Sequence, residues 1–221
     1  MKDRDETPEG IDRKLAVHYY ARWKFTRDLL PSLQRAKDAG QEAKVVSVFG
    51  AGKGTAIDTD DLGLKKGFSV AAAGGAAPTY NDLMVEVSIP KSSNPNSYHP
   101  LRNPSIPFIH AYPGLVRTAY VSRFDSAFLR AASKSVLGLL YLFTVSGEEC
   151  AEYMWHGVFS TSETKGSAGV QGAWRIGSRG EDLGTKRYFG DDVEEILGAY
   201  MGIDLCKLGY LWYYRRHIIM F

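Results

Sequence analysis

The glycine-rich run 50–55 comes closer than any other stretch of this sequence to a phosphate-binding pattern. It reads Gly-Ala-Gly-Lys-Gly-Thr and follows a short apolar segment. A P-loop needs Gly-Lys-Ser/Thr, but Lys53 is followed by Gly54, and Ser47 stands where the leading glycine belongs. The dinucleotide-binding pattern would need a glycine at Thr55. We therefore interpret the run as a tight loop after a buried strand, without a phosphate site.

Two other groups of polar residues have spacings that could support chemistry. Tyr20 and Lys24 are one helical turn apart, and we interpret them as a solvated or partner-facing pair. Glu148, Glu149 and Glu152 are close together on an expected helix. No histidine accompanies them at metal-ligand spacing, so we expect a solvated face and no metal site.

The elements that must position these residues alternate between helix and strand. Apolar residues such as Ile11 and Leu15 recur at helical spacing, and Gly40 is a typical helix stop. Ser146 and Glu149 form a capping-box pattern. The alternation predicts an α/β fold with a parallel sheet. The first expected helix begins at residue 11, has its apolar periodicity up to residue 33 and ends within residues 37–40. The other expected helices cover residues 78–86, 122–143 and 146–159, and the expected strands cover residues 45–49, 106–111 and 173–176.

The composition limits the classes of partner. The chain has 221 residues, of which 44% are hydrophobic and 24% charged, and its net charge of +2 gives no reason to expect a nucleic-acid partner. Its longest apolar run, residues 136–145, is far shorter than the about 20 residues of a membrane span. Two cysteines and a polar N-terminus lead us to expect a cytoplasmic protein with neither a disulfide framework nor a signal peptide.

Three segments together resemble a known family. Residues 15–20 read Leu-Ala-Val-His-Tyr-Tyr, residues 44–50 read Lys-Val-Val-Ser-Val-Phe-Gly, and residues 112–118 read Tyr-Pro-Gly-Leu-Val-Arg-Thr. In this order they resemble the Val-Asn-x-x-Gly helix, the strand ending in the catalytic serine and the Pro-Gly-x-Val-x-Thr loop of the short-chain dehydrogenase/reductase family. The Asp-Asp-Leu triplet at 60–62 resembles the retinol-dehydrogenase-like branch and its fungal members. The resemblance covers about residues 8 to 190.

The resemblance implies hydride transfer between NADP or NAD and an alcohol or carbonyl carbon. In the family a tyrosine transfers the proton, a lysine four residues later lowers the tyrosine pKa, and a serine and an asparagine assist. Tyr80 stands at the tyrosine place and His18 at the asparagine place, which makes them the expected catalytic residues. The expected nicotinamide contacts are Pro113, Gly114, Val116 and Thr118.

Each catalytic residue has a purely structural alternative. Without the resemblance, Tyr80 reads as an ordinary half-buried tyrosine and His18 as a hydrogen-bonded core residue. The chain also departs from the family, because Met84 stands where the lysine belongs and Gly50 where the serine belongs. No G-x-G-x-x-G fingerprint precedes residue 18.

We accordingly expect an incomplete Rossmann-type doubly wound parallel sheet that lacks the N-terminal strands and the glycine-rich motif. Residues 1–197 would form this partial domain, followed by an atypical aromatic tail, 198–221. Residues 87–102 hold three prolines, four serines and two asparagines, and we interpret them as an atypical insertion. We hypothesise that they derive from a retained intron. A genomic alignment without an exon boundary near codon 87 would exclude this origin.

Three functional readings follow. The first is a truncated, catalytically impaired oxidoreductase acting on a small-molecule alcohol or carbonyl compound. The second is a divergent but active oxidoreductase in which Tyr80 donates the proton and His18 assists. The third is a non-catalytic interaction module or inactive pseudoenzyme fragment, whose open sheet edge would pair with another chain or a second copy. A membrane partner is not expected.

Overall fold

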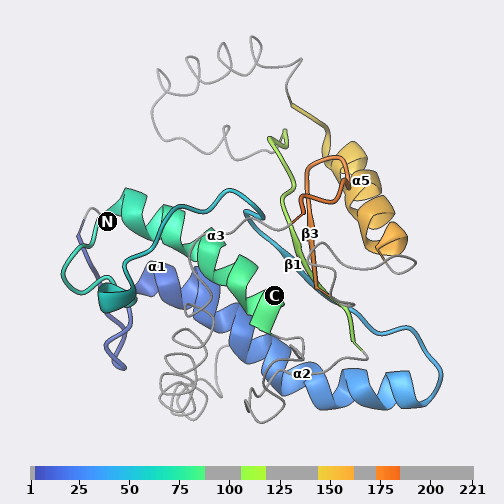
Figure 1. The fold of residues 1–221 in the computed structure, drawn as a ribbon, viewed down its shortest axis with the longest axis horizontal. Helices are drawn as coiled ribbons and strands as arrows, with labels where there is room; N and C mark the ends of the chain where they lie inside the picture. Colours follow the sequence, from blue (N-terminus) through green and yellow to red (C-terminus); the bar gives the residue numbers. More distant parts are fainter. Residues whose placement is uncertain (1–2, 88–105, 118–143, 162–172, 185–221) are drawn as a thin grey trace.

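The computed structural model describes residues 3–87, 106–117, 144–161 and 173–184. Within these ranges, a small sheet lies between one helix on one face and long helical segments on the other (Figure 1). The helical elements are α1 (Arg13–Leu15), the π-helix η1 (Ala16–Tyr20), α2 (Ala21–Asp38), the 3-10 helix η2 (Thr59–Asp61), α3 (Val70–Val87) and α5 (Gly147–Ser160). The strands are β1 (Val45–Val48), β2 (Phe108–Ala111) and β3 (Ala173–Ile176).

The sheet confirms the predicted α/β fold with parallel strands. Its order is β1-β2-β3, and both strand pairs are parallel. The strand expected over 173–176 forms as predicted, and the strand expected over 45–49 ends one residue earlier. The strand expected over 106–111 begins only at Phe108, because Pro107 has no N–H to donate to a ladder. The architecture is compatible with part of a Rossmann-like fold, and the expected incompleteness stays a prediction.

The two faces of the sheet differ in their cover. Phe108 and Ala173 belong to the larger core cluster, which α3 and the N-terminal helical segment complete. The next register row, which includes Ile109 and Trp174, packs with Val158 of α5. Helix α3 contacts β2 and β3 from the first face, and α5 contacts β3 from the second. Helices therefore cover both faces, as in doubly wound folds.

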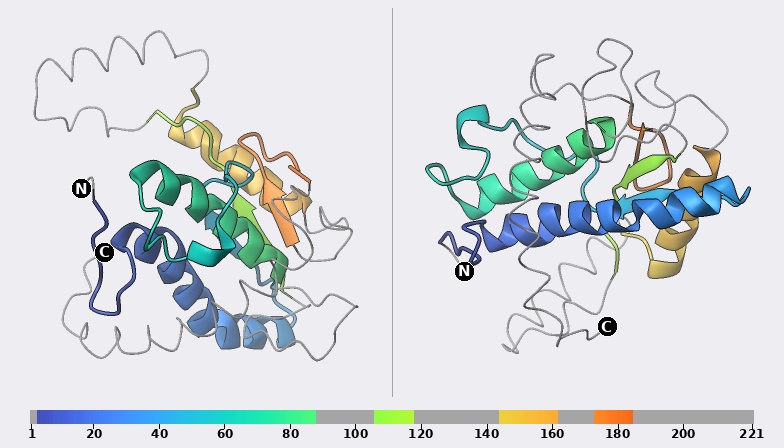
Figure 2. Two further views of the ribbon diagram at one scale, coloured as in Figure 1. Left: turned by 60° about the vertical axis from the view of Figure 1, so that its left-hand side comes forward. Right: turned by 90° about the horizontal axis from the view of Figure 1, so that it is seen from below.

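The N-terminal helical segment ends at the predicted stop, next to Gly40, and begins two residues after Ile11. Helices α1, η1 and α2 follow one another without a break from Arg13 to Asp38, and they run beside α3 (Figure 2). The buried Asp12 begins the segment, because its Oδ1 accepts hydrogen bonds from the N–H groups of Lys14 (2.9 Å) and Leu15 (3.2 Å). Gly40 ends it with a φ of +76°, a left-handed conformation that glycine adopts readily.

Helix α3 begins eight residues before the expected start at Pro78, at Val70. The alanine- and glycine-rich stretch 71–77, which precedes the expected helix, is therefore helical as well. Its start is capped by Ser69, whose Oγ accepts a hydrogen bond from the N–H of Ala72 at 2.9 Å. Burial of Ala73, Ala76 and Ala77 in the core stabilises the turn that follows. Tertiary packing thus outweighs the low helix propensity of two adjacent glycines.

Helix α5 confirms the predicted capping box. Ser146 Oγ accepts a hydrogen bond from the Glu149 N–H (3.1 Å), and the Glu149 carboxylate accepts one from the Ser146 N–H (2.8 Å). The expected helix 122–143, the insertion apart from Val87, and the aromatic tail lie outside the described residues. Their boundaries and the intron hypothesis stay predictions. Of the helices that the structure describes, none combines the length and the apolar character needed to cross a membrane.

The adjacent Gly74 and Gly75 of α3 provide a matched test of how this helix packs against the loop after β1. A Cβ at Gly74 would meet nothing within 4 Å, so Gly74→Ala should stabilise the fold by about 0.5–1 kcal/mol through helix propensity. A Cβ at Gly75 would lie 2.3 Å from Thr55 Oγ1, so Gly75→Ala should destabilise it by about 1–3 kcal/mol. Urea unfolding of both variants measures the difference. Equal effects of the two substitutions would contradict the described contact between α3 and the loop after β1.

Candidate functional site

The carboxyl ends of the three strands meet at one edge of the sheet. We call the loops that leave them (residues 49–55, 112–117 and 177–183) the carboxyl-edge loops. Phe49 N–H donates to the Ala111 carbonyl at 2.7 Å, and Tyr112 N–H donates to the Ile176 carbonyl at 2.9 Å. The Nζ of Lys53 lies 4.8 Å from the centroid of the Tyr112 ring. In open α/β sheets, ligands bind outside this edge, so the carboxyl-edge loops form the candidate site.

The loop after β1 turns its N–H groups inward. Gly50 N–H donates to His110 Nε2 at 3.2 Å, and Gly52 N–H donates to Asp82 Oδ2 at 3.0 Å. A phosphate cradle requires such N–H groups to point at the ligand. Here two of them are committed to buried side chains, one of which is a carboxylate. The interpretation of 50–55 as a structural loop is consistent with this geometry.

The two partners of that loop, Asp82 and His110, belong to a polar network that also includes the buried Arg175 and the partly exposed Glu86. Asp82 and His110 are fully buried, and His110 Nδ1 lies 2.6 Å from Asp82 Oδ1. Because His110 Nε2 accepts from Gly50 N–H, the proton of the neutral ring resides on Nδ1 and is donated to Asp82. The hydrogen-bond geometry therefore assigns the tautomer of this histidine.

Arg175 connects the network to β3 and the end of α3. This buried residue places Nη2 2.9 Å from Glu86 Oε1 and Nη1 3.9 Å from Asp82 Oδ2. Buried charges are tolerated only when paired in this way. The sequence reasoning missed the network. The available signal was the occurrence of His110 and Arg175 inside two apolar strand segments, since the register places them side by side.

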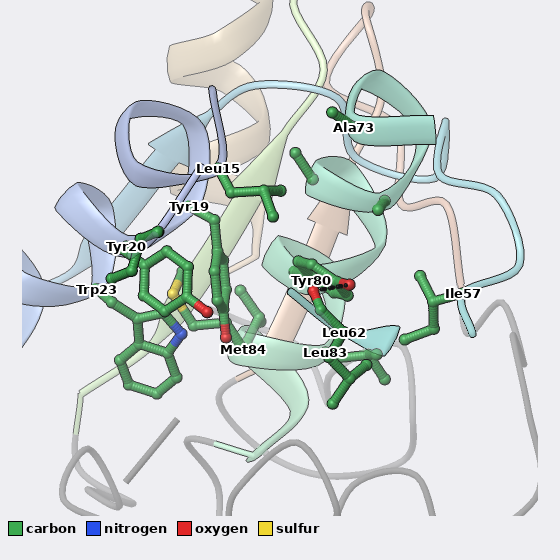
Figure 3. Packing of buried hydrophobic residues seen from close by; sticks show 14 of the residues in the cluster. Leu15, Tyr19, Tyr20, Trp23, Ile57, Leu62, Ala73, Tyr80, Leu83 and Met84 are labelled. Atoms are coloured by element: carbon green, nitrogen blue, oxygen red, sulfur yellow. Dashed lines mark hydrogen bonds between the residues drawn. The ribbon is translucent and has the colours of Figure 1, made fainter. Parts of the chain in front are cut away.

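Tyr80 lies in the core rather than on a carboxyl-edge loop. The residue is 2% exposed, and its hydroxyl donates to the Leu62 carbonyl at 2.8 Å (Figure 3). Its ring centroid is 5.2 Å from that of Tyr19. Met84, one helical turn later, stands where the family has its lysine, and it is buried in the same larger core cluster as Tyr80. In this arrangement the Tyr80 hydroxyl is held by a backbone carbonyl, and its catalytic role stays a prediction.

His18 lies on η1, and the core interpretation of it was wrong. The residue is exposed, and its ring stacks on Phe49 with centroids 5.1 Å apart. Partial burial of the ring against its neighbours and the positive charge of Arg22 both lower the pKa of His18. Asn81 Nδ2, next to Tyr80 in the chain, donates to the His18 carbonyl at 3.0 Å. Asn81 thus links the backbones of His18 and Tyr80, the two predicted catalytic residues. Their side chains have different partners, because the His18 ring stacks on Phe49 and the Tyr80 hydroxyl donates to the Leu62 carbonyl.

The predicted nicotinamide contacts fall on the loop after β2. Gly114 has a φ of +75°, and a Cβ there would lie 2.8 Å from Ser178 Cβ, so glycine is required for both conformation and space. The Pro113 carbonyl lies 3.5 Å from Cys150 Sγ. Val116 forms a parallel bridge with Val145. Thr118 lies outside the described residues.

The loop after β1 leaves little room for the missing serine. A Cβ at Gly50 would lie 3.1 Å from Pro78 Cγ, so a serine there would require the α3 proline to move by a few tenths of an ångström. Within the described part of the chain, no group of three or more histidine, cysteine, aspartate or glutamate residues could hold a metal ion. The described part of the site consists of the turns after the three strands and of a rim formed by Lys53 and Tyr112.

Removal of the Asp82 carboxylate should have a large effect on stability. Asp82→Ala leaves His110 Nδ1–H and the Gly52 N–H without their acceptor and is expected to cost about 3–5 kcal/mol. Asp82→Asn keeps one acceptor and should cost less. The exposed Asp38→Ala, near the end of α2, serves as the control and should stay within about 0.5 kcal/mol of wild type. Denaturant unfolding measures all three, and equal costs for Asp82→Ala and Asp38→Ala would contradict the described network.

Comparison with known proteins identifies several fungal relatives. The chain is 35% identical over 156 residues to Oxidoreductase AN1596 of Emericella nidulans, which covers 69% of this chain and 42% of the relative. It is 31% identical over 150 residues to Oxidoreductase andH of Emericella variicolor, which covers 68% of this chain and 40% of the relative. The NmrA-like family domain-containing oxidoreductase notO of Aspergillus sp. is 28% identical over 120 residues, which covers 53% of this chain and 32% of that protein.

These matches define how far the similarity extends. No protein-family model matches the chain, and no solved structure matches it. The chain spans less than half the length of these curated relatives. At 28–35% identity over one half to two thirds of its own length, the sequence is similar to fungal proteins named oxidoreductases, and this similarity supports an oxidoreductase family.

Proposed function

We propose that this chain contributes part of an NAD(P)-dependent oxidoreductase of short-chain dehydrogenase type, acting on an alcohol or carbonyl compound. One observation carries the proposal: the Pro113–Gly114 turn lies at the carboxyl edge of a parallel sheet, in a chain similar to fungal oxidoreductases. This is the edge at which open α/β sheets bind ligands. Assignment to the retinol-dehydrogenase-like branch, to NADP or NAD, and to the cytoplasm belongs to the same proposal.

Of the described residues, only those of the turn at Pro113–Gly114 lie where the resemblance places the nicotinamide, at the carboxyl edge of the sheet. The space beside Gly114 is occupied by Ser178, because a Cβ on Gly114 would lie 2.8 Å from Ser178 Cβ. The loop after β1 does not fit the phosphates, because the N–H groups of Gly50 and Gly52 donate to His110 and Asp82. We therefore derive no reaction step through the cofactor from these residues.

Impaired catalysis is part of the proposal. Met84 cannot supply the cation that activates the family tyrosine, and Gly50 cannot supply a hydroxyl to the substrate. The Tyr80 hydroxyl would also have to leave the Leu62 carbonyl before it could donate to a substrate oxygen. His18 is better placed, because its exposed ring stacks on Phe49, the first residue of the carboxyl-edge loops.

We also propose a partner at the edge of the sheet. Among the described strands, β1 lies at one edge, and two of its valines, Val46 and Val48, are 40% and 44% exposed. An exposed apolar edge strand is a template for pairing with a further strand, from a second copy or another chain. A small-molecule alcohol or carbonyl compound is the proposed substrate, and neither a nucleic acid nor a membrane is proposed as a partner.

Nucleotide binding is the first test of the proposed function. We expect NADPH or NADH to quench the emission of the four tryptophans saturably and to raise the melting temperature of the full chain. A ligand at 100 times its Kd should stabilise the fold by about 2.7 kcal/mol. Tyr80→Phe should then abolish any turnover, whereas Tyr153→Phe on α5 should leave it unchanged. A chain that melts cooperatively but binds neither nucleotide would reject the proposal in favour of an interaction module.

A further inference from the structure

The side chain of Arg22 extends from α2 to the end of β1, where the first carboxyl-edge loop begins. Its Nη1 donates hydrogen bonds to Ser47 Oγ and to the Val48 carbonyl, both at 3.0 Å. Its Cζ lies 5.0 Å from the centroid of the Phe49 ring, a cation–π contact. Contacts with three successive residues therefore hold the guanidinium in one position.

The positive charge of Arg22 has no counter-ion among the described residues. Both of its hydrogen-bond acceptors are neutral. The aspartate on the same stretch of helix, Asp28, pairs instead with Lys24 and Arg27. Partial burial of the guanidinium lowers the pKa of Arg22, and no carboxylate opposes this effect. Because charges taken out of water are normally paired, this position favours an anion.

Two hydrogen-bond donors beside the Phe49 ring are available to such an anion. Nη2 of Arg22 makes no hydrogen bond to a described residue, and in contrast to Nε it is not a buried atom. His18, one helical turn earlier, is exposed, and its ring nitrogens make no hydrogen bond within the same part of the chain. Its ring stacks on Phe49 with the centroids 5.1 Å apart. The two donors thus belong to side chains that contact the same ring.

The donors and the charge at this position favour a carboxylate over a phosphate. Phosphate sites commonly present several backbone N–H groups to the ligand. Gly50 and Gly52, in the loop that Phe49 begins, donate their N–H groups to buried side chains instead. The single charge of one guanidinium matches the single charge of a carboxylate, and this pairing is among the strong hydrogen-bonded pairs of proteins.

We propose that Arg22 and His18 bind a carboxylate at the end of β1. Arg22 supplies the positive charge and an Nη2–H donor, and His18 supplies a ring N–H. The inference rests on the proposed function in one respect, the identity of the ligand. Phe49 places the two side chains at the start of the carboxyl-edge loops, so the carboxylate belongs to the substrate of the proposed reaction. The alcohol or carbonyl substrate is then a hydroxy or oxo carboxylic acid.

A purely structural role of Arg22 predicts a different result. The N–H groups of Val45 and Phe49 donate to β2 and the residues that flank it, so the alternation of the strand directs the Val48 carbonyl to the open edge of β1. In a structural role, Arg22 would only cover this edge. The protein would then show no preference for a carboxylate over a neutral group of the same shape.

The test uses benzoate as the probe and the full 221-residue chain, at constant ionic strength. We expect benzoate, added without nucleotide, to shift the NMR signals of the His18 imidazole and the Phe49 amide saturably. Benzamide, the neutral isostere, should bind at least about tenfold more weakly, the factor that corresponds to about 1.4 kcal/mol. Phenyl phosphate should also bind more weakly than benzoate. Equal or tighter binding of either analogue, or the absence of saturable shifts, would overturn the proposal.

Variants of α2 test whether the carboxylate binds at Arg22. Arg22→Met removes the charge, and Arg22→Gln removes it while keeping an N–H donor for the Val48 carbonyl. Each should weaken benzoate binding at least about tenfold. Arg35→Met removes the same charge from an exposed position of the same helix and should leave binding unchanged. Circular-dichroism melting shows which variants are folded, and unchanged binding by a folded Arg22 variant would overturn the proposal.

The outcomes distinguish this inference from the proposed function. Benzoate binding is measured in the absence of nucleotide, and nucleotide binding in the absence of benzoate. If the chain binds benzoate through Arg22 but binds neither NADPH nor NADH, the carboxylate site stands and the oxidoreductase proposal fails. If it binds nucleotide but not benzoate, the oxidoreductase proposal stands and the carboxylate site fails.

Discussion

The hydrogen bond between Asp82 and His110 organises the described part of this protein. It joins α3 to β2 where neither group reaches solvent, and both side chains also accept N–H groups of the loop after β1. Arg175 brings β3 into the same network through Glu86 and Asp82. Breaking one member leaves the others buried and unpaired, at a cost well above that of an exposed ion pair. The network therefore fixes the relative positions of two strands, one helix and the loop after β1.

The close approach between α3 and the loop after β1 depends on small residues as well as on this network. A Cβ at Gly54 would lie 2.6 Å from the Thr79 nitrogen, so only glycine allows the loop to run along α3 at this distance. Gly75 provides the same clearance for Thr55. The glycine-rich run is thus explained by packing against a helix that is itself rich in alanine and glycine. The glycines of residues 50–55, which resemble a phosphate-binding loop in the sequence, are thus required for close contacts inside the fold.

Local patterns predicted local structure well. Apolar runs located all three described strands to within two residues, and the Ser146–Glu149 spacing identified the cap of α5, because these features depend on neighbours in the chain. The start of α3 at Val70 was missed because burial of Ala73, Ala76 and Ala77 by distant segments outweighs the propensity of the stretch. Likewise, Asp82 and His110 are 28 residues apart, and only the register of the sheet and the placement of α3 bring them together. The exposure of His18 also depends on tertiary packing, since its ring meets Phe49 from another element.

The loop after β1 donates two of its N–H groups to buried side chains, so these groups cannot bind a ligand at the carboxyl edge. Among the described residues, the turn at Gly114 and the pair of Lys53 and Tyr112 remain as features of the carboxyl edge that are not used in this way. Tyr80 belongs to α3, the helix that the buried network anchors to the edge, and its hydroxyl donates a hydrogen bond to the carbonyl of Leu62. A reaction in which Tyr80 donates a proton would thus have to release this hydroxyl from Leu62, which makes that single hydrogen bond the link between the fold and the proposed activity.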